Sequence, residues 1–156
     1  MTKVMEMSRP VEILLVEDNP GDVRLTEEAL KEGKVSSNLS VVGNGIEALA
    51  FLRQEGKYSS SPRPDLMLLD LNLPLKSGHE VLRELKSDPA IRNIPVVVLS
   101  TSSAKQDILS TYNLHANCYI TKPVDLDQFM KVIQSIESFW LSIVELPSLE
   151  AGDQKS

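Results

Sequence analysis

Short, nearly wholly apolar runs alternate along the chain with amphipathic stretches, and this alternation repeats five times. Runs of this kind are typical of strands that are buried on both faces of a parallel sheet. The expected strands are 11–16, 39–43, 65–70, 95–100 and 118–121. Between the strands, apolar positions recur every three or four residues, which predicts helices that bury one face. These helices cover 20–33, 45–55, 77–87 and 104–113, and a fifth follows the last strand.

Residues that favour helix ends stand at the boundaries of these helices. The run DNP at 18–20 offers cap candidates and a first-turn proline, and Gly33 stands where that helix should stop. Ser77 and Asp125 are N-cap candidates for later helices. Strict alternation of strand and helix with short connections predicts an α/β fold with right-handed crossovers. We therefore expect a flavodoxin-like, doubly wound (βα)5 domain whose five-stranded parallel sheet has the order 2-1-3-4-5.

The chain has 156 residues, a length that suits one domain with its own hydrophobic core. We expect an N-terminal extension at 1–9, the domain itself at 10–146 and a flexible tail at 147–156. The polar stretch 55–64 is expected to be a surface loop before the third strand.

Charge and composition narrow the classes of partner. The formal net charge of -6 disfavours nucleic acid, because proteins that bind it usually present a basic face. Neither a signal sequence nor a stretch long enough to span a membrane is evident. The single cysteine, Cys118, excludes a disulfide within the chain and fits a reducing cytoplasm. The sequence thus predicts a cytoplasmic protein that binds neither membranes nor nucleic acid.

Polar side chains follow the apolar runs at the carboxyl ends of the predicted strands. Glu17 and Asp18 follow the first strand, and Asp70 ends the third. Ser100 closes the fourth strand, and Lys122 comes after the fifth. Ligands of open α/β sheets bind at this edge, where the carboxyl ends of parallel strands meet. We therefore expect these five side chains to form one site.

Three carboxylates at one edge call for a cation. Each pair of carboxylates 4 Å apart costs about 4 kcal/mol at an effective dielectric constant near 20, and Lys122 offsets only part of this. A hard divalent cation with oxygen ligands, such as Mg²⁺, would offset the rest, with Glu17 and Asp18 holding it. Its open positions suit a phosphoryl oxygen, which favours phosphoryl transfer with Asp70 as the nucleophile. Lys122 and the hydroxyl of Ser100 would then bind the phosphate.

Four motifs, ILLVEDNPGD, LLDLNLP, VVVLSTS and YITKP, resemble the receiver domains of two-component response regulators. The spacing agrees, since Ser100 stands 30 positions after Asp70 and Lys122 stands 22 positions after Ser100. The resemblance covers about residues 10–146. It implies a response regulatory domain that accepts a phosphoryl group on Asp70 from a sensor histidine kinase.

The resemblance also implies a metal site and a switch. Mg²⁺ would be held by Asp18, Asp70 and the backbone carbonyl of Asn72, with Glu17 acting through water. Ser100 would be the switch residue whose hydroxyl moves first, and Tyr119 would be the aromatic residue that rotates in response.

Two further features concern the strand ends. The resemblance implies a cis peptide bond between Lys122 and Pro123, a bond type that proline makes accessible. Thr101 stands where the family usually has alanine or another small residue. Its branched side chain would narrow access to the phosphate, so the phosphoryl lifetime does not follow from the resemblance.

Three longer segments, EDNPGDVRLTEEAL, YNLHANCYITKPVDLDQF and FWLSIVELP, are similar to the small response regulators paired with cyanobacterial phytochromes. This similarity implies a phytochrome-type kinase as the phosphodonor. We expect a single-domain response regulator without an output domain in the chain. It would catalyse only its own phosphorylation and dephosphorylation, and it would signal to an unknown downstream protein through changed protein–protein contacts.

The last predicted helix carries more apolar residues than one face against the sheet requires. The surplus either covers the edge of the sheet or forms an interaction surface. The family resemblance favours a homodimer through the last strand and last helix, with Phe139, Trp140 and Ile143 in the interface.

Three other functions compete with this interpretation. A Mg²⁺-dependent phosphohydrolase with an aspartyl phosphate intermediate often has a second aspartate two residues after the nucleophile, where this chain has Asn72. A flavodoxin-like FMN-binding protein needs a hydroxyl-rich phosphate loop, whereas VEDNPGD would repel a phosphate unless a cation intervened. The third alternative is a binding module of the same fold that works without phosphorylation.

Overall fold

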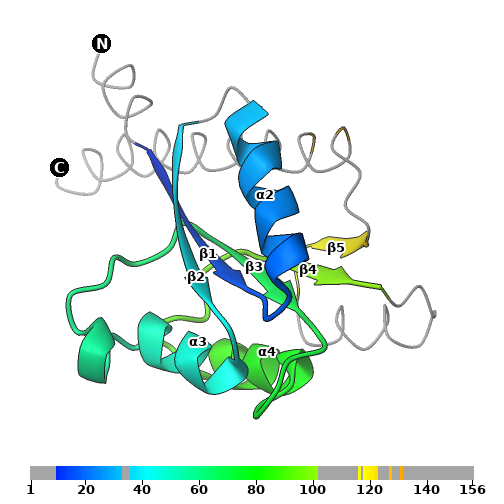
Figure 1. Ribbon diagram of the computed structural model, residues 1–156. Helices are drawn as coiled ribbons and strands as arrows, with labels where there is room; N and C mark the ends of the chain where they lie inside the picture. The colour runs from blue at the N-terminus through cyan, green and yellow to red at the C-terminus, as the bar shows by residue number, and fades with distance from the viewer. Residues whose placement is uncertain are drawn as a thin grey trace, which may run out of the picture.

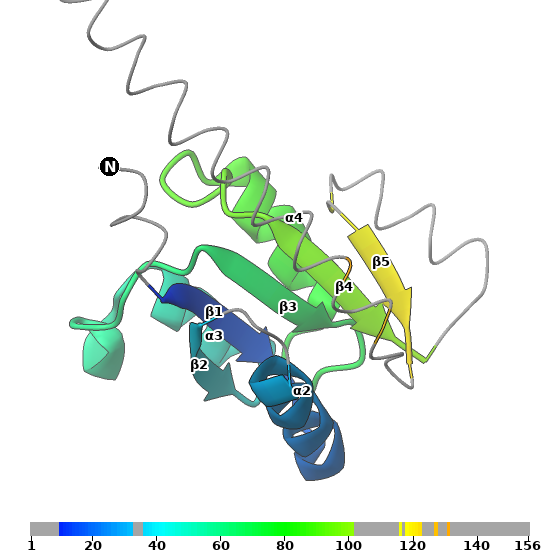
Figure 2. The same cartoon turned by 90° about the horizontal axis from the view of Figure 1, so that it is seen from above.

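The computed structural model describes residues 10–32, 36–101, 116, 118–122, 127 and 131. Five strands form one sheet, in which every neighbouring pair is parallel and the order is β2-β1-β3-β4-β5. The strands are β1 (Val11–Val16), β2 (Ser37–Val42), β3 (Leu66–Asp70), β4 (Val96–Ser100) and β5 (Cys118–Thr121). Figure 2 shows them side by side and running in the same direction. The predicted fold class and strand order are confirmed.

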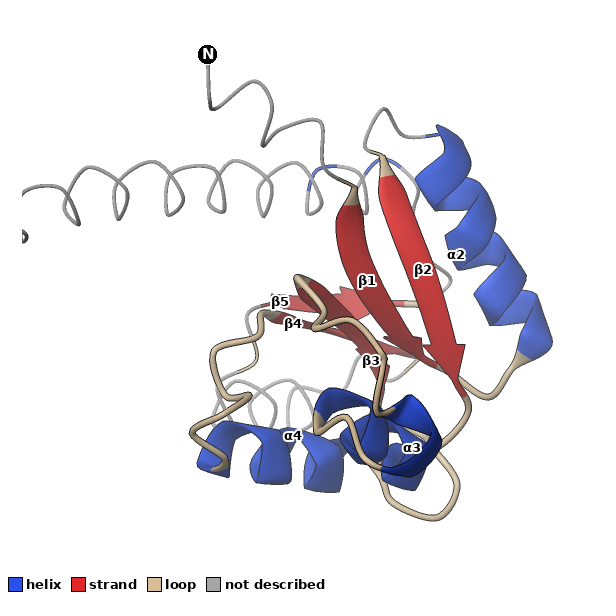
Figure 3. Cartoon of the chain, turned by 90° about the vertical axis from the view of Figure 1, so that its left-hand side faces the viewer, coloured by secondary structure: helices blue, strands red, loops and turns tan. Residues whose placement is uncertain are grey.

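Helices cover both faces of the sheet (Figures 1 and 3). α2 (Pro20–Glu32) lies on one face, and α3 (Gly45–Leu52) and α4 (Gly78–Ser87) lie on the other. A short 3-10 helix, η1 (Gly56–Tyr58), follows α3. None of the helices within these described segments is both long and apolar enough to cross a lipid bilayer.

Side chains that alternate along β1 explain why the sheet separates two apolar clusters. Leu14 and Val16 belong to the cluster under α3 and α4, whereas Ile13 and Leu15 belong to the cluster under α2. Every residue of the strands β3 and β4 is buried, as expected for strands in the middle of a parallel sheet. The continuous apolar runs of the sequence therefore mark the middle of the sheet.

Side-chain caps begin the three described α-helices. The Oδ1 atom of Asn19 accepts the N–H groups of Gly21 (2.8 Å) and Asp22 (3.1 Å), which confirms the predicted cap of α2. Ser77 is the N-cap of α4, as predicted, and the structure adds that it forms a reciprocal capping box with Glu80. Asn44, which the sequence reading did not identify as a cap, accepts the Glu47 N–H at 2.8 Å and begins α3.

The observed bounds of β2 and α3 differ from the predicted ones. β2 covers 37–42 instead of 39–43, because its two polar first residues pair in register with β1 at an edge that faces solvent. α3 ends at Leu52 instead of residue 55, since Gln54 has a left-handed φ of 56°. The other strand boundaries agree to within one residue.

The expected surface loop 55–64 contains an ordered turn that the polar composition concealed. Its residue Tyr58, in η1, is half-buried, and its ring lies 5.3 Å from that of Phe51, centroid to centroid. The ring contact attaches the loop to α3. The polar segment therefore contains one aromatic residue, Tyr58, that packs against α3.

Several expectations concern residues outside the described part of the chain. These are the helix at 104–113, the caps at Gly33 and Asp125, the cis bond to Pro123, and the interface residues Phe139, Trp140 and Ile143. Of the helix after the last strand, Asp127 and Lys131 are described and both are helical. The domain limits at 10 and 146 stay predictions.

Candidate functional site

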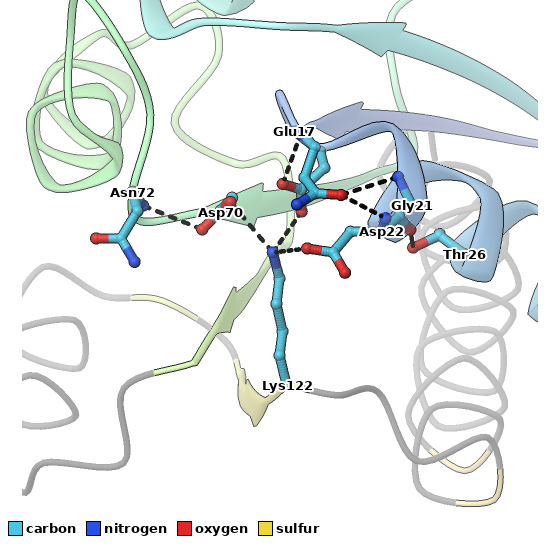
Figure 4. Close-up of polar contacts among 8 residues, drawn as sticks. Glu17, Gly21, Asp22, Thr26, Asp70, Asn72 and Lys122 are labelled. Atoms are coloured by element: carbon cyan, nitrogen blue, oxygen red, sulfur yellow. Dashed lines mark hydrogen bonds and ion pairs between the residues drawn. The ribbon is translucent and has the colours of Figure 1, made fainter.

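The parallel strands deliver the expected polar side chains to one edge of the sheet (Figure 4). Glu17 directly follows β1, Asp70 is the last residue of β3, and Lys122 directly follows β5. Ser100 ends β4, and its carbonyl accepts the backbone N–H of Lys122 at 2.7 Å. Four of the five residues of the predicted constellation therefore lie at the ends of strands along a single edge of the sheet.

The ammonium of Lys122 is surrounded by carboxylates. Its Nζ donates to Oε1 of Glu17 at 2.6 Å, to Oδ2 of Asp22 at 2.9 Å and to Oδ2 of Asp70 at 3.2 Å. An ammonium has three N–H donors, and each of them is matched by one carboxylate. The Lys122 side chain is only 6% exposed, so these charge-assisted hydrogen bonds are largely shielded from water.

Glu17 is the most deeply buried carboxylate of the site, with a side chain only 1% exposed. Its Oε2 atom accepts the backbone N–H of Asn19 at 3.3 Å, so the chain that begins α2 also orients it. Burial and the neighbouring Asp70 carboxyl raise the pKa of Glu17 to about 7, against the opposing effect of Lys122. Near neutral pH the Glu17 carboxyl is therefore present in both its charged and its neutral form.

The same contacts also raise the pKa of Lys122. Burial by itself lowers the pKa of its ammonium, but the hydrogen bonds to Glu17 and Asp22 and the charges of Asp70 and Glu17 outweigh it. The pKa of Lys122 therefore lies above its ordinary value. The site keeps one permanent positive charge among its carboxylates.

Both oxygens of the buried Asp70 carboxylate have a donor. Oδ2 accepts Lys122, and Oδ1 accepts the backbone N–H of Asn72 at 3.0 Å. The chain then turns back on itself, and the N–H of Gly78 donates to the carbonyl of Leu71 at 3.0 Å. A Cβ atom at residue 78 would lie 2.5 Å from the carbonyl oxygen of Asp70, so only glycine permits this close return. The loop from β3 to α4 therefore returns to the end of β3, and its Asn72 N–H holds the Asp70 carboxylate.

The same edge of the sheet offers oxygen ligands for a divalent cation. Carboxylate oxygens of Glu17, Asp18 and Asp70 lie within 4.8 Å of one another. Glu17 and Asp70 are buried and Asp18 is exposed, so the cluster opens toward solvent on one side. An all-oxygen donor set of this kind suits a hard cation that keeps some of its waters. The residues present therefore fit a divalent metal ion.

The remaining expected residues lie close to these strand ends. Ser100 is 1% exposed at the end of β4, and Thr101 after it is exposed. Tyr119, in β5, is half-buried and packs against the apolar cluster under α3 and α4. The side chains expected to work together thus come from β1, β3, β4 and β5.

The contact of Asp22 with Lys122 was not expected from the sequence. Asp22 stands in the first turn of α2, where an acidic residue is commonly explained by the helix dipole. Its contact with Lys122, 100 residues later, follows from the placement of the α2 N-terminus beside the ends of β1 and β3. The signal available in the sequence was its spacing, five residues after Glu17 and three after the cap Asn19.

Comparison with known proteins gives consistent results. Residues 13–134 match the family of response regulator receiver domains. Response regulator Rcp1 of Synechocystis sp. strain PCC 6803 is 50% identical over 143 residues, which cover 92% of this chain and 97% of that protein. The crystal structure of the phosphorylated cyanobacterial phytochrome response regulator RcpA is 54% identical with a TM-score of 0.74, covering 86% of this chain and 96% of its own. The Mn²⁺-bound form of Rcp1 is 52% identical with a TM-score of 0.73, covering 85% and 95%.

Proposed function

The chain belongs to the family of response regulator receiver domains, and from this premise we propose that Asp70 accepts a phosphoryl group from the phosphohistidine of a sensor histidine kinase. The observation that carries the proposal is the position of the Asp70 carboxylate. It is buried at the carboxyl end of a central strand, next to an ammonium and next to an acidic cluster that fits a divalent cation. These are the requirements for a carboxylate nucleophile that takes up a phosphoryl group.

In this reaction a bond forms between a carboxylate oxygen of Asp70 and phosphorus. The bond between phosphorus and the imidazole nitrogen of the kinase breaks, and its electron pair returns to that nitrogen. The Asn72 N–H orients the carboxylate through Oδ1, so that it cannot rotate away from the donor. Lys122 and the hydroxyl of Ser100 bind the oxygens of the incoming phosphoryl group and stabilise their charge.

We propose that the metal ion is Mg²⁺. Asp18, Asp70 and the backbone carbonyl of Asn72 would hold it directly, and Glu17 would act through water. When bound, Mg²⁺ supplies positive charge that neutralises the phosphoryl oxygens. The acidic cluster and the Mn²⁺-bound form of Rcp1 support this assignment.

The output of the protein would be a change in its surface. Phosphorylation of Asp70 draws the Ser100 hydroxyl toward the phosphoryl group, and Tyr119 follows by rotating inward. The half-buried position of Tyr119 against the apolar cluster supports a residue with two positions. The protein would then transmit the signal by changed protein–protein contacts with a downstream protein, and its own phosphorylation and dephosphorylation would be its only catalysis.

The proposed phosphodonor is a phytochrome-type histidine kinase in the cytoplasm. The support is the identity with RcpA and Rcp1, of which RcpA is described as a phytochrome response regulator. Transfer of labelled phosphate from an autophosphorylated phytochrome kinase, faster than from an unrelated histidine kinase, is the expected result. Equal rates from both kinases would contradict this part of the proposal.

A homodimer through the last strand and last helix completes the proposal. Its support is the apolar surplus of the last predicted helix, which includes Phe139 and Ile143, and Trp140 is the third proposed interface residue. Sedimentation velocity of the wild type should show a dimer, and Ile143→Asp should shift it to the monomer. A monomer in both proteins, with and without phosphorylation, would contradict the dimer.

The phosphorylation itself is tested by incubating the protein with Mg²⁺ and acetyl phosphate and then measuring the intact mass. We expect the wild type to gain the mass of one phosphoryl group in an acid-stable, base-labile linkage. Asp70→Asn, and the wild type with a metal chelator, should gain none. Many turnovers of phosphate release without a trapped phosphoprotein would instead support a phosphohydrolase. Tight binding of FMN without metal would support a flavodoxin-like protein.

A further inference from the structure

Asp22 is a fourth carboxylate at the site, and it stands apart from the three that form the metal-binding cluster. Its Oδ2 atom accepts a hydrogen bond from Nζ of Lys122 at 2.9 Å, across 100 residues of sequence. Resting on the function proposed above, we propose that Asp22 is a positioning residue that holds the Lys122 ammonium before phosphorylation and releases it to the phosphoryl group.

The donor count of Lys122 means that binding a phosphoryl oxygen displaces one of its present partners. Its three N–H groups are directed at Glu17, Asp22 and Asp70. A phosphoryl oxygen can be bound by this ammonium only if one of the three carboxylates gives up its hydrogen bond. Phosphorylation of Asp70 therefore forces an exchange of partners on Lys122.

Burial identifies which partner leaves most easily. The side chains of Glu17 and Asp70 are 1% and 6% exposed, whereas that of Asp22 is 32% exposed. Glu17 also accepts the Asn19 N–H, and Asp70 loses its own negative charge when it carries the phosphoryl group, so Asp22 is the more readily displaced of the two partners that stay charged. Asp22 can turn to water, where its charge is solvated, so its displacement meets the smallest desolvation penalty.

The backbone of Asp22 is held independently of its carboxylate. Its N–H donates to Oδ1 of Asn19 at 3.1 Å, and its carbonyl accepts the Thr26 hydroxyl at 3.0 Å. Figure 4 shows the Thr26 contact on the helix side of Asp22, with the Asp22 carboxylate directed at Lys122. The side chain can therefore leave the ammonium without disturbing the start of α2.

Asp22 and a phosphoryl group compete for the Lys122 ammonium because both are negatively charged. Two anions that share one ammonium repel each other, and the phosphoryl group carries about two negative charges near neutral pH. The negative carboxylate of Asp22 therefore favours the unphosphorylated site. Removing this charge should strengthen binding of a phosphoryl group at Asp70.

The test is the affinity for beryllofluoride, a phosphoryl mimic, measured by calorimetric titration in the presence of Mg²⁺. Asp22→Asn should bind it about two- to fivefold more tightly than the wild type, as expected for loss of a competing, partly exposed ion pair. Asp22→Glu should restore an affinity near that of the wild type. Glu27→Gln removes the same charge from an exposed position of the same helix and should leave the affinity unchanged.

A merely structural role for Asp22 predicts the opposite sign. Loss of a first-turn acid weakens the helix, which would lower the affinity for beryllofluoride. Equal or weaker binding by Asp22→Asn, or an equal gain in Glu27→Gln, would overturn the inference and leave the proposed function standing. A wild-type protein that binds no beryllofluoride at all would instead contradict the proposed function.

Discussion

Nζ of Lys122 lies 2.6 Å from Oε1 of Glu17, a residue 105 positions earlier in the chain. The strand order places β3 and β4 between the two strands that deliver these residues, so the lysine side chain crosses the end of the sheet. Both side chains are almost fully buried. This ion pair therefore spans the carboxyl ends of β3 and β4, at the point where the phosphoryl group is proposed to bind.

Replacing Lys122 should therefore destabilise the metal-free protein. Lys122→Met leaves the buried carboxylates of Glu17 and Asp70 without their cation, and breaking a buried ion pair in this way costs about 3 kcal/mol or more. Urea unfolding with a chelator present measures the loss, and addition of Mg²⁺ should restore part of it.

The matched control for Lys122 is Lys57→Met. Lys57 is 71% exposed and pairs with Glu47, so its loss should change the free energy of unfolding by about 1 kcal/mol at most. If the two lysine variants were equally stable without metal, the buried carboxylates would not depend on the Lys122 ammonium.

Replacing Asp18, the exposed carboxylate of the acidic cluster, tests metal binding independently of folding stability. Asp18→Asn should weaken Mg²⁺ binding at least about tenfold, because it removes one charged oxygen ligand. Its metal-free stability should stay the same or rise, since Asp18 is exposed and adds repulsion to Glu17 and Asp70. Calorimetric titration with MgCl₂ and urea unfolding measure the two effects. An unchanged Mg²⁺ affinity would exclude Asp18 from the metal site.

The raised pKa of Glu17 gives metal binding a pH dependence. Metal binding favours the charged carboxylate and releases its proton, so Mg²⁺ affinity should rise about tenfold per pH unit below pH 7 and level off above it. Titrations from about pH 6 to about pH 8 measure this slope. Glu17→Gln should flatten it, and a slope that persists in this variant would assign the proton to another group.

Metal-free stability should follow the opposite trend. The pKa of Glu17 rises from 4.5 in the unfolded chain to about 7 in the folded protein, because of burial and the Asp70 carboxyl. The folded state therefore binds the proton more tightly, and this contribution is fully present below pH 4.5 and lost as the pH rises to about 7. Urea unfolding with a chelator across this range, compared with Glu17→Gln, isolates the contribution of Glu17.

Close packing of α3 against the loop after Asp70 makes Gly45 sensitive to substitution. A Cβ atom there would collide with the backbone carbonyl of Lys76 and would lie 2.7 Å from Cγ2 of Val81. Gly45→Ala should therefore reduce the free energy of unfolding by about 1–3 kcal/mol and slow phosphorylation by displacing the loop. Gly43→Ala is the control, because no atom lies within 4 Å of its added Cβ. Equal stability of the two variants in thermal unfolding would contradict the close packing.

The fold and most of the site followed from local patterns in the sequence. Apolar runs such as 66–69 fit only the doubly covered middle of a parallel sheet, and this fixes where Asp70 emerges. Because parallel strands end at one edge, Glu17 and Lys122 could be placed beside Asp70 from their positions after strands.

The features that were missed depend on contacts that local patterns do not encode. The bond from Asp22 to Lys122 requires the orientation of α2 relative to β5, which has no periodic signal in the sequence. Tyr58 lies in a polar stretch, and only its ring contact with Phe51 shows that the segment is anchored. The first residues of β2 are polar because an edge strand exposes one side.

The central claim, that Asp70 is the phosphoryl acceptor, is tested most directly by locating the phosphoryl group. Acyl phosphates are reduced by borohydride, which converts a phosphorylated aspartate into homoserine. After phosphorylation with Mg²⁺ and acetyl phosphate, reduction and digestion, mass spectrometry should find homoserine at position 70 and at no other aspartate. Homoserine at Asp18 or Asp22, or an unmodified Asp70 in a protein that carries phosphate, would contradict the account.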